Sequence, residues 1–208
     1  MALDTFANLK TTIANYLNRD DLTAYIPDFI SLTEKRLNRE LRVREMINTD
    51  TSTTTVSGTQ NYNLPTGFIE AISVIFQSDP FTTLSYISNH DFYRSYNSSV
   101  TSGTPTFFTI VGDKIKLGVA PDQAVTLQID FYKNVTALTD SNTTNDILTN
   151  YPELYLYGSL AESSPFLMQD ERLQTWASLY KEAVIKANES SSKGSSSTPL
   201  LMSARSVV

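Results

Sequence analysis

The sequence contains no cysteine and a single histidine, and it has no long apolar run. Without cysteine there is no disulfide framework, no thiolate metal site and no cysteine nucleophile, so folding does not depend on an oxidising compartment. No segment approaches the roughly 18 consecutive apolar residues that a membrane-spanning helix needs. The start, Met1 to Asp4, lacks the basic residues of a signal peptide. We therefore expect cytoplasmic synthesis and no membrane association.

Basic residues are also few. The 16 Lys and Arg residues are outnumbered by 22 Asp and Glu residues, which gives a net charge of -6. Most non-specific affinity for nucleic acid comes from cations that displace counterions from the phosphate chain, so this balance argues against general nucleic-acid binding. At 208 residues the chain is long enough to bury a core in one domain with an insertion, or in two small lobes.

The residues that usually carry catalysis are sparse. His90 has no cysteine to share a zinc ion with, so a zinc site would need an unusual set of carboxylates. The pair His90 and Asp91 imitates part of a hydrolytic triad, but no Gly-x-Ser-x-Gly motif accompanies it, and Ser88 is better explained as a helix cap. We predict no catalytic residues.

One loop resembles the start of a calcium-binding loop. Residues Asp140 to Asp146 have the right alternation of oxygen-bearing side chains, but Asn145 stands in the glycine position and Tyr151 in the position of the bidentate glutamate. Polar side chains that satisfy their own backbone in a turn explain this loop better. We predict no metal site and no cofactor.

Helical periodicity occurs at both ends of the sequence. Asp4 is placed to cap the first helix, Pro27 and Pro152 to begin two others, and Pro165 to interrupt or end the third. The four predicted helices cover residues 5–17, 27–46, 152–165 and 169–188. Short helix pairs need another layer to cover their apolar faces, so we expect the four to form one bundle.

Between the helices, β-branched and aromatic residues alternate with turn residues. Gly112 and Asp113 form a tight hairpin turn, and residues from Ser88 to Tyr96 fit a short helix. The predicted strands cover residues 51–56, 62–64, 69–76, 107–111, 114–119 and 125–132. The predicted fold is α+β: a four-helix bundle formed by residues 1–48 and 150–189, with a small antiparallel β-lobe inserted at 49–149 and an extended C-terminal tail at 190–208.

The most distinctive segment runs from Glu34 to Glu45, where five cations and three carboxylates occur in twelve residues. Apolar or small residues recur every fourth position from Phe29 to Leu41, so one helix face can pack inward while the charges project outward. Such a face could contact a neighbouring subunit, bind phosphates or remain solvated with local ion pairs. The interspersed acids favour the subunit contact. The candidate interface residues are Arg36, Arg39, Arg42, Arg44, Glu34, Glu40 and Glu45.

The tail begins as a serine-rich tether, Ser190 to Thr198, and continues with apolar residues. Ordering it would cost on the order of tens of kcal/mol of backbone entropy, whereas burying four apolar side chains recovers only roughly 6 to 12 kcal/mol. If the tail becomes ordered, it must therefore also gain backbone hydrogen bonds on a partner, for instance by adding a strand to an exposed edge or extending a helix. The alternative is a frayed terminus. The candidate docking residues are Pro199, Leu200, Leu201 and Met202.

Several short patterns, taken in order, resemble the head-to-tail adaptor, or head-completion, proteins of short-tailed bacteriophages. The likeness spans nearly the whole chain, and the serine-rich tether departs from the pattern. The patterns are Leu17-Asn18-Arg19-Asp20-Asp21-Leu22, the helix from Phe29 to Arg42, Leu64-Pro65-x-x-Phe68, Gly103-x-Pro105, Asn145, the segment Tyr151-Pro152 to Leu160, and Asp170-Glu171-Arg172-x-x-x-Trp176.

The resemblance implies a structural virion protein rather than an enzyme. It implies a homo-oligomeric ring, commonly of twelve copies, beneath the portal protein in the neck between capsid and tail. Within that ring, the tail residues Pro199, Leu200, Leu201 and Met202 would bind the portal. The ring would contact tail or nozzle proteins and surround the DNA channel without binding DNA specifically, and the chain would be synthesised in the host cytoplasm. Two other classes stay open: a tail-associated glycan-binding or hydrolytic module, which would show a cleft with paired carboxylates, and a DNA-binding accessory protein, whose binding would fall steeply with salt.

Overall fold

The computed structural model describes residues 3–96, 102–167 and 172–195, and within these ranges it contains six α-helices and seven strands. The chain divides into two compact units. The helical unit comprises Met1–Glu45 and Val135–Val208, and the sheet unit comprises Met46–Asn134. The sheet unit is therefore an insertion into the helical unit.

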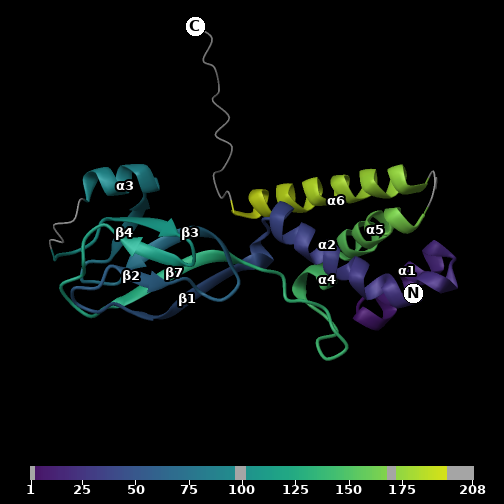
Figure 1. The fold of residues 1–208 in the computed structure, drawn as a ribbon, viewed down its shortest axis with the longest axis horizontal. Helices are drawn as coiled ribbons and strands as arrows, with labels where there is room; N and C mark the ends of the chain where they lie inside the picture. The colour runs from purple at the N-terminus through teal and green to yellow at the C-terminus, as the bar shows by residue number, and fades with distance from the viewer. Residues whose placement is uncertain (1–2, 97–101, 168–171, 196–208) are drawn as a thin grey trace, which may run out of the picture. The chain divides into compact units, whose positions relative to one another are not determined.

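The helical unit is built from helices of very different length (Figure 1). Its long helices α2, α5 and α6 pack together, with α5 in contact with both of the others. The elements are α1 (Phe6–Leu17), η1 (Asp20–Tyr25), α2 (Ile26–Glu40), α4 (Asp146–Asn150), α5 (Pro152–Glu162), η3 (Ser164–Phe166) and α6 (Arg172–Ser195), and the short helix η2 (Arg44–Met46) spans the border between the units.

Local sequence signals explain where several of these helices begin. Pro27 and Pro152 lie in the first turns of α2 and α5, where a missing backbone N–H costs nothing. The predicted cap of α1 is displaced by one residue, because Oγ1 of Thr5 accepts the hydrogen bond from N of Asn8 at 3.3 Å. Asp4 instead accepts from the side chain of Asn8 at 2.7 Å.

The predicted end of α2 is wrong. We expect the helix to continue to about Met46, but it stops at Glu40, and Leu41 has an extended backbone with φ of -97° and ψ of 134°. Leu41 and Val43 are both fully buried. In an extended chain residues two apart share one face, so the end of α2 at Glu40 lets Leu41 and Val43 be buried together.

The last helix, α6, extends further than predicted. It continues to Ser195, seven residues beyond Asn188, although serine is a modest helix former. The predicted start at Gln169 lies outside the described residues, as do the four candidate docking residues of the tail, Pro199 to Met202.

The sheet unit contains a seven-stranded mixed sheet in the order β1-β7-β3-β4-β5-β6-β2 (Figure 1). Asn63 of β2 and several residues of β1 line one pocket, so the two terminal strands approach each other and the sheet is nearly closed, like a barrel. The elements are β1 (Ile47–Thr54), β2 (Asn61–Asn63), β3 (Phe68–Phe76), β4 (Thr82–Tyr86), α3 (Asn89–Ser95), β5 (Phe107–Val111), β6 (Lys114–Leu117) and β7 (Thr126–Lys133).

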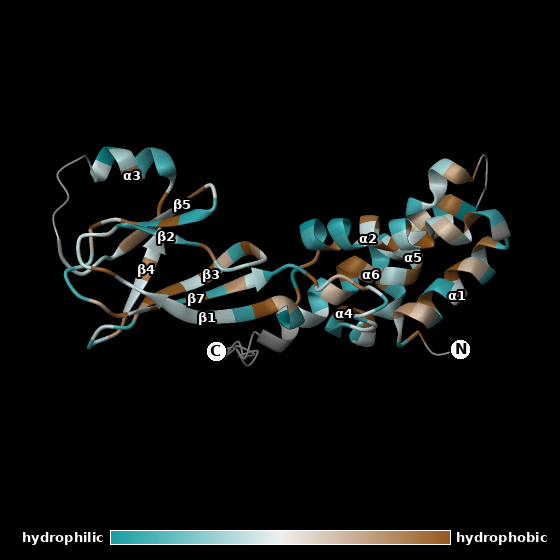
Figure 2. Cartoon of the chain, turned by 60° about the horizontal axis from the view of Figure 1, so that its bottom comes forward, coloured by the Kyte–Doolittle hydropathy of each residue, from teal (hydrophilic) through white to brown (hydrophobic). Residues whose placement is uncertain are grey.

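Alternation of side chains gives this sheet one apolar face. Leu127, Ile129 and Phe131 of β7 are at most 2% exposed and belong to the core of the unit. On the other face of the same strand, the carboxylate of Asp130 accepts hydrogen bonds from Thr49 of β1 at 2.7 Å and Ser73 of β3 at 2.6 Å. Figure 2 shows hydrophobic and hydrophilic residues interleaved along the strands, and α3 as mostly hydrophilic.

The predicted four-helix bundle with a small antiparallel β-lobe is wrong. The helical unit includes the five-residue helix α4, which Asn145 caps and which is too short to produce a periodic pattern. The sheet is mixed because β4 and β5 pair in parallel. The chain makes an excursion through α3 between these two strands, and it therefore returns to the sheet in the same direction.

Candidate assembly surface

The charged segment Glu34 to Glu45 is not a uniform surface stripe. It covers the last two turns of α2, the extended residues 41–43 and the start of η2. Its charged side chains fall into two groups, those that hold the helical unit together and those that are free to contact another molecule.

Glu34 belongs to the first group, because it is only 7% exposed. Its Oε1 accepts hydrogen bonds from backbone N of Leu138 at 2.7 Å and from the hydroxyl of Tyr155 at 3.2 Å. Burial raises the pKa of the Glu34 carboxyl, and these two hydrogen bonds only partly oppose that rise. The expected outward projection of Glu34 is therefore wrong.

The network continues through Tyr155 to Asn145. The Tyr155 hydroxyl accepts a hydrogen bond from Nδ2 of Asn145 at 2.7 Å, and burial, followed by the nearby charge of Glu34, raises the pKa of this hydroxyl. Asn145 also donates to the carbonyl of Thr136 at 2.7 Å and caps α4 by accepting from N of Leu148 at 2.8 Å. The cap agrees with the prediction that polar side chains of residues 140–146 bond to nearby backbone, whereas the contacts of Asn145 with Tyr155 and Thr136 were not predicted.

A second side chain of α2 binds the backbone of residues 135–138, the segment that contains Leu138. Oδ1 of Asn38 accepts a hydrogen bond from backbone N of Val135 at 2.8 Å. Glu34 and Asn38 are four residues apart and lie on one side of the helix. Together they hold two backbone N–H groups of residues 135–138, where the chain re-enters the helical unit. In the sequence, two polar residues spaced four apart beside the apolar face of α2 were the signal that could have indicated this contact.

Arg36 joins three helices within its own chain. Its Nε donates to Glu40 of α2 at 3.1 Å and its Nη1 to Glu162 of α5 at 3.2 Å. The guanidinium carbon lies 4.3 Å from the ring centre of Tyr180 in α6, a cation–π contact. Arg36 and Glu40 therefore already have interaction partners within their own chain.

The extended residues after α2 lie along the end of α6. Backbone N of Arg42 donates to Oδ1 of Asn188 at 2.8 Å, and backbone N of Arg44 donates to Oγ of Ser191 at 2.8 Å. The guanidinium of Arg42 also turns back, donating to the carbonyls of Asn38 and Leu41 at 3.1 and 2.7 Å. Alternate N–H groups of the extended chain are thus held by side chains one turn apart on α6.

Close packing of the helices depends on Gly158 of α5. A Cβ atom there would lie 2.4 Å from Cγ2 of Thr33 in α2 and 3.2 Å from the ring of Tyr180 in α6. Gly158 lies in the segment from Tyr151 to Leu160 that resembles the adaptor pattern, and its missing side chain lets three helices approach each other.

The second group is small. Arg39 and Arg44 have exposed side chains, and within the described residues neither side chain makes a hydrogen bond or an ion pair. Leu32, 45% exposed, and Lys35 lie seven and four residues before Arg39 on the same side of α2. Glu45 is partly buried and accepts a long hydrogen bond of 3.4 Å from the hydroxyl of Tyr151. We call Leu32, Lys35, Arg39 and Arg44 the assembly surface.

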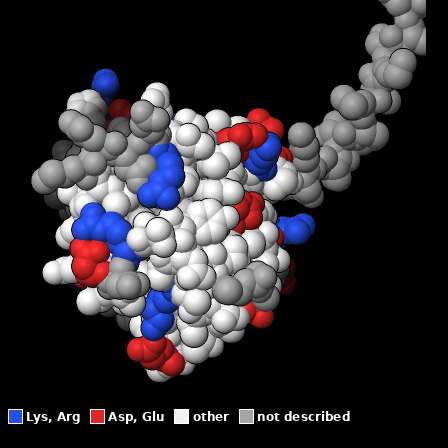
Figure 3. Space-filling model, turned by 90° about the vertical axis from the view of Figure 1, so that its right-hand side faces the viewer, with Lys and Arg blue, Asp and Glu red and all other residues white. Residues whose placement is uncertain are grey.

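Figure 3 shows one face of the molecule, on which side chains of both charge signs are scattered among uncharged residues. On the described part of this face, no broad patch of a single sign gathers. An extended basic patch is what a nucleic-acid interface would require.

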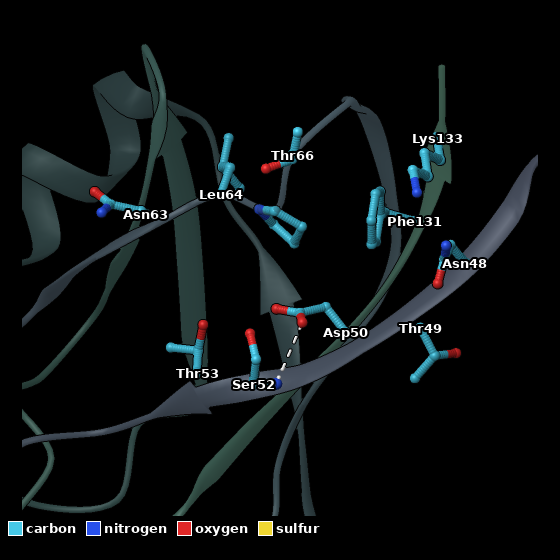
Figure 4. Close-up of a pocket in the computed structure, with 11 residues that line it drawn as sticks. Asn48, Thr49, Asp50, Ser52, Thr53, Asn63, Leu64, Thr66, Phe131 and Lys133 are labelled. Carbon is cyan, nitrogen blue, oxygen red and sulfur yellow. Dashed lines mark hydrogen bonds between the residues drawn. The ribbon is translucent and has the colours of Figure 1, made fainter. Parts of the chain in front are cut away.

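The sheet unit carries an open polar pocket of about 420 Å³ (Figure 4). Residues Asn48 to Thr53 of β1 line one side, residues Asn63 to Thr66 the opposite side, and Phe131 and Lys133 of β7 complete it. Asp50 is the one carboxylate in its lining, and it accepts a hydrogen bond from N of Ser52 at 3.2 Å. This pocket does not have the paired carboxylates that would distinguish a glycan-hydrolysing module.

Ser88, His90 and Asp91 lie together at the start of α3. Ser88 caps α3, as predicted, by accepting from N of Asp91 at 3.2 Å, and its own hydroxyl donates to the Asp91 carboxylate at 2.7 Å. The exposed ring of His90 lies 3.5 Å from the same carboxylate. Across the described ranges, no three side chains of His, Asp or Glu gather closely enough to hold a metal ion.

None of the helices in the described part of the chain combines the length and the hydrophobicity needed to cross a membrane. Among curated proteins, no match to the sequence is found. The sequence profile of one protein family, described as SU10 adaptor protein, matches residues 4–202. This match covers both units and extends past α6 as far as Met202. The chain therefore belongs to the SU10 adaptor protein family, a family of phage head-to-tail adaptors.

Proposed function

We propose that this adaptor assembles into a ring, with twelve copies, that joins the portal of the capsid to the tail and surrounds the channel for DNA. Membership of the adaptor family supports a structural role in the virion. The net charge of -6 suits a channel through which phosphates must pass without adhering. In this role the chain contacts other copies of itself, the portal and proteins of the tail.

The observation that best supports the proposed ring is that some charged side chains of residues 34–45 have partners within the chain and others do not. Arg36 and Arg42 are engaged inside the helical unit, whereas Arg39 and Arg44 are exposed without partners among the described residues. Charged groups placed in this way give an interface its partner specificity. The chain has an excess of acids, so a second copy can supply the opposite charge. Arg39 and Arg44 of one copy therefore pair with carboxylates of the next.

Analytical ultracentrifugation of the purified chain, alone and mixed with portal rings, tests this proposal. The wild type is expected to sediment as a multi-copy ring, alone or on the portal. The double variant R39E/R44E is expected to stay folded but to form no ring in either sample, because like charges then face each other. A matched control, K114E/K133E, changes the net charge equally at exposed lysines of the sheet unit and should assemble normally. Assemblies of wild-type mass from R39E/R44E would refute the role of these arginines.

A further inference from the structure

One strand of the sheet unit has an incompletely covered edge. β3 lies between β7 and β4 in the sheet order, and it pairs with β7 from Phe68 to Phe76. With β4 it pairs only at its last three residues, Val74 to Phe76. Along the first two thirds of β3, no described strand lies beside the edge that faces β4. An edge of this kind offers its backbone groups to an added strand.

The opposite side of the same gap is formed by β5. Its parallel pairing with β4 is limited to two positions, Ser85 with Phe107 and Tyr86 with Phe108. After Ile87, whose N donates to the carbonyl of Phe108 at 3.0 Å, the chain leaves the sheet to form α3. The end of β5 therefore also lacks a described strand neighbour on this side.

Between β3 and β5 lies an apolar cavity of about 590 Å³, which we call the β3–β5 slot. Two of its lining side chains are large, hydrophobic and well exposed, with Ile72 at 47% and Tyr86 at 60%. Glu70 is the one charged residue in the lining. The slot is lined by Phe68, Ile69, Glu70, Ala71, Ile72, Ser73, Thr83, Leu84, Tyr86, Phe108 and Ile110.

The last thirteen residues of the sequence, 196–208, have the chemistry of a strand that fits this slot. In an extended chain, Leu200, Met202 and Ala204 would share one face, and Leu201, Ser203 and Arg205 the other. Arg205 is the one charged side chain of the segment, and none of its side chains is acidic. The family match extends to Met202, well past the end of α6.

We propose that residues 199–208 of one copy add a strand to the β3 edge in the slot of a neighbouring copy. The added strand gains the backbone hydrogen bonds that side-chain burial alone cannot replace, and its apolar face covers Ile72 and Tyr86. The donor is a second copy because a tail bound in its own slot would link nothing, whereas the proposed ring needs a contact between subunits. The inference in this respect rests on the proposed function.

A binding measurement tests the slot directly. The probe is a fluorescent peptide of residues 196–208, and the receptor is the full chain with L200D/M202D, which disables its own tail. Fluorescence anisotropy should show saturable binding that weakens at least tenfold when I72K/Y86K is added to the receptor. Both positions are exposed, so the receptor keeps its fold. The matched control V56K, at another exposed apolar residue of the sheet unit, should bind as before. If the peptide binds the receptors with and without I72K/Y86K equally tightly, the slot is not its binding site.

A mixing experiment tests whether the strand is exchanged between copies. Chains with L200D/M202D keep a working slot, and chains with I72K/Y86K keep a working tail. Both chains also carry R39E/R44E, so that the assembly surface cannot join them. Mixing them should therefore yield one-to-one complexes by native mass spectrometry. If each tail instead binds its own slot or only the portal, no complex forms and the inference is rejected. If the pair associates while the wild type never closes a ring, the slot stands and the proposed ring fails. If rings form equally well from I72K/Y86K, the ring stands and the slot fails.

Discussion

Gly158 illustrates how a single missing side chain sets the distance between helices. A Cβ atom at this position would collide with Cγ2 of Thr33 at 2.4 Å. Gly158→Ala should therefore destabilise the helical unit by about 1–3 kcal/mol, a typical cost of overpacking, measured by urea denaturation. Gly103→Ala is the matched control, since nothing lies within 4 Å of its Cβ position, and it should change little.

A double substitution separates this collision from a general effect on α5. Thr33→Ser removes the methyl group but keeps the hydroxyl that donates to the carbonyl of Phe29 at 2.9 Å. Added to Gly158→Ala, it should recover a substantial part of the lost stability. Additive losses in the double variant would show that the contact with Thr33 is not the cause.

Glu34 gives the helical unit a pH dependence of predictable sign. Because burial raises its pKa in the folded chain above 4.5, the unfolded chain releases this proton at lower pH than the folded chain does. The contribution of Glu34 to stability is therefore largest at low pH and declines as pH rises from about 4.5 through the folded pKa. Glu34→Gln should remove that decline, measured as urea midpoints across pH, because an amide oxygen can still accept both hydrogen bonds.

Glu34→Ala supplies the contrast. It leaves the backbone N–H of Leu138 without its acceptor and should cost about 1–3 kcal/mol. If Glu34→Gln loses stability with rising pH as steeply as the wild type, the titration belongs to another group.

At the scale of elements, Asn188 is the residue that fastens the end of α2 to α6. Its Oδ1 accepts from N of Arg42 at 2.8 Å, and its Nδ2 donates to the carbonyl of Glu40 at 3.2 Å. Asn188→Ala should lower stability by about 1–2 kcal/mol and accelerate hydrogen exchange at the Arg42 amide. Asn188→Asp keeps the acceptor and should protect that amide better than alanine does. Equal exchange in both variants would contradict the bridge.

How well an element could be predicted depended on whether its pattern is local. The strand Phe107–Val111, the hairpin turn at Gly112 and the cap at Ser88 follow from alternation, backbone freedom and side-chain hydrogen bonding, and the structure confirms all three. The early end of α2 and the parallel pairing of β4 with β5 depend on contacts with distant segments. No short window of sequence contains that information.

The same distinction separates the parts of the candidate site. Charge density correctly drew attention to residues 34–45, but it could not tell Arg36, which stacks on Tyr180 from a different helix, from Arg39, which is exposed. Composition also could not predict that Glu34 is buried. Only the positions of α5 and of residues 135–138 decide which charges remain available for a partner.

At the scale of the whole molecule, the family match and the two-unit architecture together describe an adaptor in which a sheet is inserted into a set of helices. The helical unit carries the assembly surface, and the sheet unit carries the slot. The two proposed contacts therefore belong to different parts of the chain and can be altered separately.

The pairing of β1 with β7 has a consequence for how such a protein can change. Ile47 and Tyr132, near the two ends of the inserted unit, are partners across neighbouring strands. The insertion is thus a cassette whose two junctions are adjacent, so that one module can be exchanged for another without lengthening either connection.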